Sequence, residues 1–315
     1  MVKTTTTAVA VAALLAACGG GGGGGGGGSA PTPGVLATAN YQEVSTAGAA
    51  AVSSSGALSS AISLASVPDA APVAAPAEDA GSLLRRLVER YAQPGVIRDQ
   101  PQATGSSTQG CAYGGSVRAT ATVANPNYLS AGDSISLLFT NCVEASGQPG
   151  LNGTLNISVV SPLVMSGSTI VGGELNTNSN GLIAGSMSLS GNVNMKFSGS
   201  QQTQTYQNYS VTRGGRTAVY NYAAVLSRAT VPNTLTVNAG GSITVNNANY
   251  TLSTPTALTL GSSSPIGGLM RVSDSAGARA DITPASSSTQ FSVSFYPSGS
   301  STATASYTAT WASLQ

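Results

Sequence analysis

Apolar residues occupy every second position in long stretches of the chain from Cys111 onward, and Ser, Thr and Asn fill the positions between them. This period of two is the signature of β-strands that bury one face and expose the other. The longest alternating run passes through Gly191 and contains Met187, Leu189, Val193, Met195 and Phe197. The region from Cys111 to the C-terminus is therefore expected to be an antiparallel β domain.

Turn residues divide this region into about ten to twelve expected strands with short connections, which predicts an antiparallel meander. The turns are expected at Asn152-Gly153, Asn180-Gly181, Gly214-Gly215, Gly240-Gly241 and Ser275-Ala276-Gly277. The later runs are 203–211, 217–229, 234–238, 242–246, 249–260, 267–274, 278–283, 289–296 and 302–311. Because the dry face must be covered, we expect the sheet to curl into a barrel-like or half-barrel shape. A transmembrane barrel, dry face outward, is the less favoured alternative, because no paired aromatic girdles are visible.

Two stretches before the β domain have helical periodicity. The stronger one covers residues 79–92, where Asp79 or Ser82 can cap the start and Pro94-Gly95 ends it. Its apolar stripe is Leu83, Leu84, Leu87, Val88 and Tyr91. We expect this stripe to pack on the sheet; the alternative is a basic amphipathic helix on a membrane or a partner.

The weaker helix is expected over residues 41–54, after Asn40 and Glu43 at capping-box spacing. Residues 38–110 thus form a helical and loop segment, with a loop over 55–77, and residues 111–315 form the β domain.

The composition excludes several classes of function. Charged residues make up 7% of the chain, the net charge is +1 and there is no His. Gly, Ala, Ser and Thr together account for about half of all residues, a strong bias. A chain with so few basic residues has no stripe for nucleic acid, so no nucleic-acid partner is expected. Without His there is no His-based triad and no His metal ligand.

The first 17 residues have the features of a secretory signal peptide. Lys3 precedes a short apolar run, Ala8 to Leu15, which is too short to span a bilayer. The run ends in Leu15-Ala16-Ala17-Cys18, which resembles the lipobox of bacterial lipoproteins. The resemblance implies a diacylglycerol on Cys18 and attachment to a membrane through that anchor; the alternative is an ordinary signal peptide with a chance Cys.

Residues 18–37 are expected to be a tether. Ten consecutive glycines, Gly19 to Gly28, follow Cys18, and a Pro-containing linker continues to residue 37. The glycines span roughly 17 Å as a flexible coil. In bacterial lipoproteins an Asp after the lipidated Cys commonly signals retention in the inner membrane. Gly19 stands there instead, so the resemblance implies the outer membrane, on a side that the sequence does not specify.

The three cysteines fit an exported protein with one disulfide. If Cys18 carries lipid, Cys111 and Cys142 remain as a pair. Disulfides are the default in oxidising compartments. No Cys-x-x-Cys motif is present, so we expect neither a redox site nor a metal site at these thiols.

Few groups in the β domain could carry chemistry. Asp274 and Asp281 flank an expected turn, with Arg271 and Arg279 beside them. They are either cross-strand charge pairs, which we favour, or two facing carboxylates for hydrolysis or calcium binding. Lys196 is expected on the polar face of a strand. No catalytic, cofactor-binding or metal residue is therefore expected, and the protein is not expected to be an enzyme.

Tyrosines are the second candidate feature. Tyr220 and Tyr222 share one face of an expected strand, and Tyr307 and Trp311 share another. Exposed rows would suit stacking on a sugar or a peptide. We favour core packing, because aromatic residues are common in strands.

Several short motifs together resemble a group of uncharacterised β-rich outer-membrane lipoproteins of Gram-negative bacteria. Besides the lipobox and the glycine tether, they are Ala39-Asn40, Cys111-x-x-Gly114-Gly115-Ser116, Gly132-Asp133, Asn141-Cys142, Leu151-Asn152-Gly153-Thr154, Pro265-x-x-Gly268 and Thr310-Trp311-x-x-Leu314. That group has no established activity, so the resemblance implies a location and no reaction.

Two functions are expected from the sequence. The first is a lipid-anchored cell-envelope protein with a non-catalytic structural or protein-interaction role, working with an envelope partner. The alternative is a carrier or binding module that holds an apolar ligand in the curled sheet. Helix 79–92 filling the concave face would favour the first, and a dry cavity lined by the alternating run at residues 187–197 would favour the second.

Overall fold

The computed structural model describes residues 31–59, 79–92, 104–124, 129–166, 169–229, 234–260, 265–285 and 289–314. The signal segment, Cys18 and the glycine tether lie outside these residues, as do Pro94-Gly95 and most of the loop expected over 55–77.

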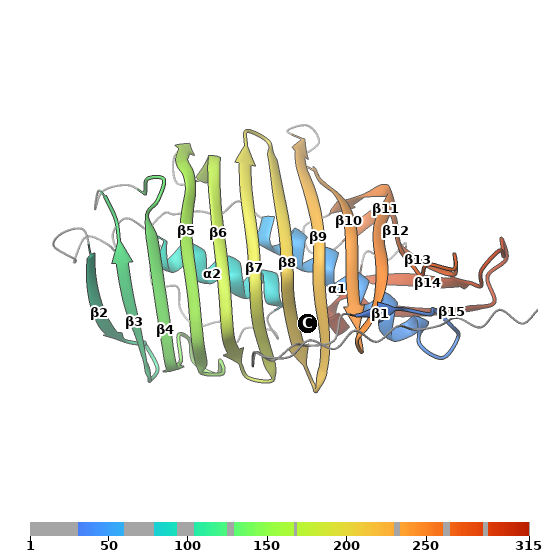
Figure 1. Ribbon diagram of the computed structural model, residues 1–315, viewed down its shortest axis with the longest axis horizontal. Coiled ribbons are helices and arrows are strands. Elements are labelled where there is room, and N and C mark those ends of the chain that lie inside the picture. Colours follow the sequence, from blue (N-terminus) through green and yellow to red (C-terminus); the bar gives the residue numbers. More distant parts are fainter. Residues whose placement is uncertain are drawn as a thin grey trace, which may run out of the picture. The chain divides into compact units, whose positions relative to one another are not determined.

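The described chain is built on one sheet of fifteen strands (Figure 1). Fourteen of them follow one another in sequence order, and all the pairings between these neighbours are antiparallel. They are β2 (Thr104–Gly110), β3 (Ser116–Thr122), β4 (Ser134–Cys142), β5 (Leu151–Ser166), β6 (Thr169–Ala184), β7 (Met187–Ser198), β8 (Gln201–Arg213), β9 (Arg216–Ala229), β10 (Thr234–Val245), β11 (Ala248–Leu260), β12 (Pro265–Ser273), β13 (Arg279–Pro284), β14 (Gln290–Tyr296) and β15 (Ala305–Thr310).

The sheet is curled but open. Strands β2 and β15 each pair on one side only, so the meander does not close on itself. The expected fold class, a mainly β antiparallel meander curled as a half-barrel with helices packed on it, is confirmed. The sheet has more strands than the ten to twelve expected.

Two strands, β2 and β6, were not expected from the sequence. Strand β2 reads Thr-Gly-Ser-Ser-Thr-Gln-Gly and has no apolar position of its own. Strand β6 contains the polar run Asn176 to Asn180. The sequence of β6 alone does not show which of its residues are buried, because their burial depends on pairing with β5 on one side and β7 on the other. The strands are thus specified by their neighbours rather than by their own alternation.

Some of the expected turns lie inside strands. Asn152-Gly153 lies in β5, Asn180-Gly181 lies in β6, and the pair at 240–241 lies in β10. Each is next to a shift of the pairing register, that is, at a bulge. Gly153 and Gly181 have φ of 100° and 58°. Glycine with a positive φ occurs in β-bulges as well as in turns, so the presence of glycine in the sequence did not distinguish a bulge from a turn. The turns at 214–215 and 275–277 are where the sequence placed them.

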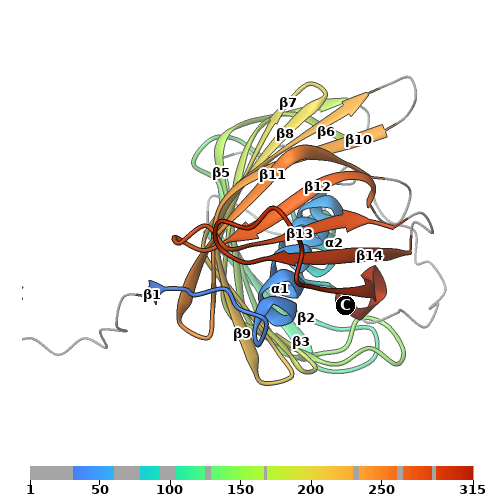
Figure 2. The ribbon, with the colours of Figure 1, turned by 90° about the vertical axis from the view of Figure 1, so that its right-hand side faces the viewer.

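Helix α1 (Tyr41–Ser59) lies in the curve of the sheet and contacts strands β9, β10, β12, β13 and β14 (Figure 2). It extends five residues beyond the expected end, into the predicted loop. The Asn40 side chain does not close a capping box: its Oδ1 accepts from the Ala37 N–H (2.9 Å) and its Nδ2 donates to the Val35 carbonyl (2.9 Å). No helix among the described segments is long and apolar enough to cross a bilayer.

Helix α2 (Ala80–Tyr91) confirms the stronger helical expectation. Asp79 caps it by accepting from the Ser82 N–H at 2.8 Å. Every residue of the expected apolar stripe is buried. The helix packs on α1, where Gly81 lies against the backbone of Ser54. The stripe is therefore part of the core, as favoured from the sequence, and is covered rather than presented to a membrane.

Two contacts stabilise the end of the sheet near β3 and β4: a disulfide within the sheet, and a buried carboxylate that binds α2. Cys111 and Cys142 form the expected disulfide, which joins the turn before β3 to the end of β4. The buried carboxylate of Glu144 accepts from Tyr91 Oη at 2.7 Å and pairs with Arg86 and Arg90 of α2.

The last residues of the expected tether are held on the sheet. Strand β1 (Thr32–Pro33) pairs parallel with β11. The Leu36 N–H donates to Asp274 Oδ2 at 2.9 Å. The described part of the expected linker, residues 31–37, thus includes a short docked strand. The N–H groups of Thr32 and Gly34 donate to the carbonyls of Asn247 and Asn249 in the β10–β11 hairpin, and composition does not reveal these acceptors.

Candidate functional site

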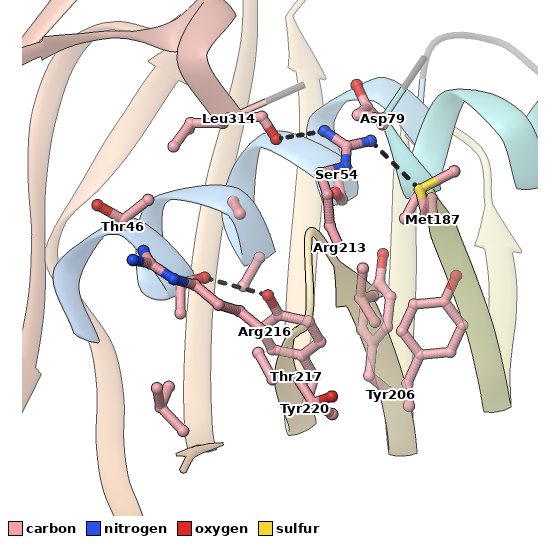
Figure 3. Close-up of a pocket in the computed structure, with 18 of the residues that line it drawn as sticks. Thr46, Ser54, Asp79, Met187, Tyr206, Arg213, Arg216, Thr217, Tyr220 and Leu314 are labelled. Atoms are coloured by element: carbon pink, nitrogen blue, oxygen red, sulfur yellow. Dashed lines mark hydrogen bonds between the residues drawn. The ribbon is translucent and has the colours of Figure 1, made fainter. Parts of the chain in front are cut away.

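A cavity of about 260 Å³ lies between α1 and the β8–β9 hairpin (Figure 3). Small residues of α1 form one wall: Thr46, Ala47, Ala50, Ala51 and Ser54. The opposite wall consists of four tyrosines of the sheet: Tyr206, Tyr209, Tyr220 and Tyr222. The space exists because short side chains on the helix face large rings on the strands.

The tyrosine rings pack on one another. The rings of Tyr206 and Tyr222, opposed on β8 and β9, stack with centroids 4.4 Å apart and planes at 11°. Tyr209 meets Tyr206 edge-on at 5.5 Å, and Tyr220 meets Tyr222 edge-on at 6.2 Å. All four are at most 5% exposed, so the favoured interpretation as core residues is confirmed for the Tyr220–Tyr222 row.

Three of the four hydroxyls are hydrogen-bonded. Tyr222 Oη donates to the Ala51 carbonyl at 2.7 Å, and Tyr206 Oη donates to Gln204 Oε1 at 2.8 Å. The longer bond from Tyr220 Oη reaches the Ala47 carbonyl at 3.4 Å (Figure 3). Within the described part of the chain, the buried Tyr209 hydroxyl has no hydrogen-bond partner. The bonds from Tyr220 and Tyr222 hold α1 on the β8–β9 hairpin, whereas the bond from Tyr206 stays within β8.

Burial keeps these phenols neutral. Desolvation raises the pKa of Tyr206 to about 12, and raises the pKa of Tyr209, Tyr220 and Tyr222 well above the ordinary value for tyrosine. The cavity wall therefore carries no negative charge from its tyrosines at physiological pH.

Two arginines stand at one edge of the cavity. Arg213 and Arg216 face each other across the Gly214-Gly215 turn. Arg213 donates to the Leu314 carbonyl at 3.0 Å and to Met187 Sδ at 3.3 Å (Figure 3). The Arg216 side chain is 78% exposed and lies 3.9 Å from Glu43. Like charges directly opposite each other on a strand pair are unfavourable, so the opposition of these two side chains does not stabilise the β8–β9 pairing.

Sequence reasoning did not single out this arginine pair. It predicted the Gly214-Gly215 turn correctly but gave no weight to the residues on either side. The sequence feature that could have identified the pair is two arginines on either side of a two-residue turn, in a chain with only 12 basic residues.

The two facing carboxylates, which were the less favoured alternative from the sequence, do not form a pair in the structure. Asp281 lies between Arg271, with contacts of 2.6 and 2.9 Å, and Arg279 at 3.7 Å. Asp274 is buried and accepts from the backbone N–H groups of Leu36, Ala276 and Ala278. The burial alternation puts the two carboxylates on opposite faces of the hairpin. The favoured interpretation, cross-strand charge pairing, is confirmed for Asp281.

Other candidate positions are structural. Lys196 is exposed and stands opposite Glu174 on β6, on the polar face as expected. Trp311, expected in a strand, begins the short 3-10 helix η1 (Trp311–Leu314) and packs on Phe291 at 4.7 Å. In the described residues no group of three or more Cys, Asp or Glu side chains is placed to hold a metal ion.

The alternating run of β7 contributes one residue from each of its ends to a cavity: Met187 to the cavity described above, and Phe197 to a second cavity of about 240 Å³ beside β6 and β9. All five of its apolar residues are buried, and only Met187 reaches the cavity described above. The other four belong to the continuous core: Leu189, Val193, Met195 and Phe197.

Comparison of the chain with protein-family models, with curated proteins and with solved structures found no match. Function is therefore inferred from the residues and the geometry of this chain.

Proposed function

We propose that the protein is a lipid-anchored component of the cell envelope whose β domain has a non-catalytic, structural or protein-interaction role. The anchor rests on the Leu15-Ala16-Ala17-Cys18 motif and the glycine tether that follows it. Gly19 after the lipidated Cys supports the outer membrane as the location. Together these features support a β domain that is held at a membrane surface through the expected glycine tether.

The observation that carries the structural role is the filled concave face of the sheet. Helices α1 and α2 lie in the curve (Figure 2), and their buried residues join those of the strands in one hydrophobic core. A sheet that carries a large apolar ligand needs this face open. The surfaces left for contact with a partner are the outer face and the two edges of the sheet.

Strand β2 is the edge best suited to a partner. It has no charged residue and no proline, the two devices that usually protect an edge, and Ser106, Thr108 and Gln109 are exposed. Among the strands that the structure describes, β2 pairs only with β3, so its outer backbone groups face none of them. A partner that adds a strand to this edge would gain backbone hydrogen bonds without displacing any element.

The anchor is tested by fractionating cells that express Cys18→Ala. We expect the wild-type chain in the outer-membrane fraction and the variant in a soluble fraction. A variant that stays with the membrane would contradict lipidation at Cys18.

The interaction role is tested with a photo-crosslinking amino acid at Thr108, on the edge strand. The matched control is the same amino acid at Lys196, which is exposed on the central strand β7. We expect discrete crosslinked products on intact envelopes from position 108 only. If position 108 gives no product, or only those also seen at 196, β2 is not the contact.

A second candidate function is favoured by one specific observation, the cavity between α1 and the β8–β9 hairpin. It supports a binding module for a small ligand, which is a narrower form of the apolar-ligand carrier expected from the sequence. Native mass spectrometry of the full chain released gently from envelopes tests this function. A reproducible extra mass that disappears when the cavity is filled by Ala50→Leu supports it, and a single mass equal to the chain alone counts against it.

A further inference from the structure

We propose that the second cavity, at the ends of strands β6 to β10, binds a small monocarboxylate. Arg228 and Gln202 hold the carboxylate, and buried apolar side chains form the floor under the rest of the ligand. Among the described residues, this cavity shares no lining residue with the cavity between α1 and the tyrosines. The inference therefore goes beyond both functions proposed above and depends on neither.

The volume of the cavity sets the size of the ligand. The cavity measures about 240 Å³ and lies at the other end of the β8–β9 hairpin from the Gly214-Gly215 turn. A dry cavity of about 150 Å³ in another protein holds benzene, which has six heavy atoms. In the same proportion, 240 Å³ holds about ten heavy atoms. Benzoate is close to this size, whereas a lipid with two long acyl chains is several times too large.

The side chain of Gln202, at the start of β8, requires an acceptor. Only 8% of Gln202 is exposed, and within the described part of the chain its buried Nε2 has no hydrogen-bond partner. Gln204 lies on the same face of β8 and is bonded: its Nε2 donates to the Ser55 carbonyl at 3.1 Å, and its Oε1 accepts from Tyr206 Oη at 2.8 Å. A buried donor without a partner is unfavourable, and a ligand oxygen in the cavity would satisfy it.

Arg228 provides a positive charge beside Gln202. Gln202 pairs with Leu226 on β9, and Arg228 follows two positions later on the same face, so Arg228 is the diagonal neighbour of Gln202. Long side chains in this relation can reach each other. They can therefore donate to the same carboxylate.

No acid neutralises Arg228 in the described part of the chain. Its side chain is exposed and forms no hydrogen bond or ion pair there, and the described lining of the cavity contains no Asp or Glu. In this respect Arg228 differs from Arg216 at the other cavity, which is paired with Glu43. A guanidinium group with free donors binds a carboxylate through charge-assisted hydrogen bonds.

The floor of the cavity favours an apolar body on the ligand. Ile170, Phe197 and Leu226 are buried members of the core, and Leu235 is partly buried against it. An apolar group that covers these side chains leaves water and gains free energy. The site thus combines an apolar floor with donors at one side, which suits a ligand with one anionic end.

Ligand-observed NMR titration of benzoate with the full chain carrying Cys18→Ala, without detergent, tests the proposal. Benzamide has the same shape without the charge, and acetate has the charge without the ring. At constant ionic strength we expect saturable binding of benzoate, and binding about ten-fold weaker for benzamide and for acetate. Absence of benzoate binding up to about 10 mM would overturn the proposal.

Two variants locate the site, each with a matched control. Arg228→Gln is expected to weaken benzoate about ten-fold and to leave benzamide unchanged, whereas Arg118→Gln, at an exposed position on β3, should change neither. Gln202→Leu removes a donor that has no described partner. It is expected to weaken benzoate about ten-fold while the urea midpoint of unfolding stays the same or rises. Gln204→Leu breaks two hydrogen bonds and should lower that midpoint.

The remaining outcomes would each overturn part of the proposal. Equal affinity of wild type and Arg228→Gln for benzoate would overturn the site. Equal affinity for benzoate and benzamide would overturn the assignment of an anion, and equal affinity for benzoate and acetate would overturn the apolar floor. A lower urea midpoint in Gln202→Leu would mean that Gln202 is bonded within the protein, and would overturn its assignment to the ligand.

These results are separate from the tests of the functions proposed above. Loss of benzoate binding in Ala50→Leu, with binding retained in Arg228→Gln, would place the ligand in the cavity beside α1 and overturn the site proposed here. Membrane release by Cys18→Ala and crosslinking from position 108 do not depend on benzoate binding.

Discussion

Replacing Gly81 by Ala tests how closely the two helices pack. A Cβ atom on Gly81 would lie 2.0 Å from the carbonyl oxygen of Ser54 and 2.9 Å from its Cα. Both atoms are backbone of α1 and cannot rotate away. An ordinary contact between carbon and oxygen is about 3.3 Å, so α2 must move by roughly 1 Å.

The free energy of unfolding follows from two opposing effects. Overpacking of a well-packed core costs typically 1–3 kcal/mol, and about 3 kcal/mol is appropriate here because backbone opposes backbone. Alanine is preferred over glycine in a helix by up to about 1 kcal/mol. The contact outweighs the preference, and Gly81→Ala should lower the stability by about 2 kcal/mol.

Equilibrium unfolding in urea measures this difference. Gly56→Ala is the control, because the new Cβ would meet only the Cδ1 end of Leu260, at 2.6 Å, and that side chain can rotate. We expect the control to stay within about 1 kcal/mol of wild type. If Gly81→Ala is as stable as wild type or more stable, α2 does not cross α1 at Ser54. The cavity is then also in doubt, since Ser54, Asp79 and Ala80 line it.

Three further predictions concern stability. Above pH 10 the unfolded state is stabilised, because it ionises tyrosines that stay neutral in the folded state. The stability should therefore fall by up to about 5 kcal/mol per pH unit in alkaline urea titrations; a flat profile between pH 9 and 11 would contradict the burial of Tyr206, Tyr209, Tyr220 and Tyr222. Replacing both Cys111 and Cys142 by Ala should destabilise the chain by about 3.7 kcal/mol, and the same loss should follow reduction of the wild type, both measured by urea unfolding. Glu144→Ala should cost about 2 kcal/mol in urea unfolding, because Tyr91 loses its acceptor and Arg86 loses a charge partner. Arg85→Ala, a half-buried arginine of the same helix that lies 3.9 Å from Glu89, should cost less than 1 kcal/mol.

The candidate site was only partly predictable. The two tyrosines of β9, Tyr220 and Tyr222, were identified as residues of one strand face, and their interpretation as core is correct. What was missing is the small-residue face of α1 that opposes them. Ala47 and Tyr220 are 173 positions apart in sequence, and no local pattern shows that they meet. The position of Arg213 and Arg216 was missed for the same reason, because these residues form an edge of the cavity only when α1 lies against the strands.

By itself the sequence determined the local features: the period of two in most strands, the apolar stripe and cap of α2, the pairing of two cysteines and the charge pairing around Asp281. These depend on residues a few positions apart, or on the chemistry of a few side chains. Only the tertiary structure decided the strands β2 and β6, the bulges in place of turns, the docking of residues 32–36 and the open edges of the sheet. The reason is physical: a polar or glycine-rich segment becomes a strand, and a glycine becomes a bulge or a turn, according to the backbone groups that neighbouring strands offer it.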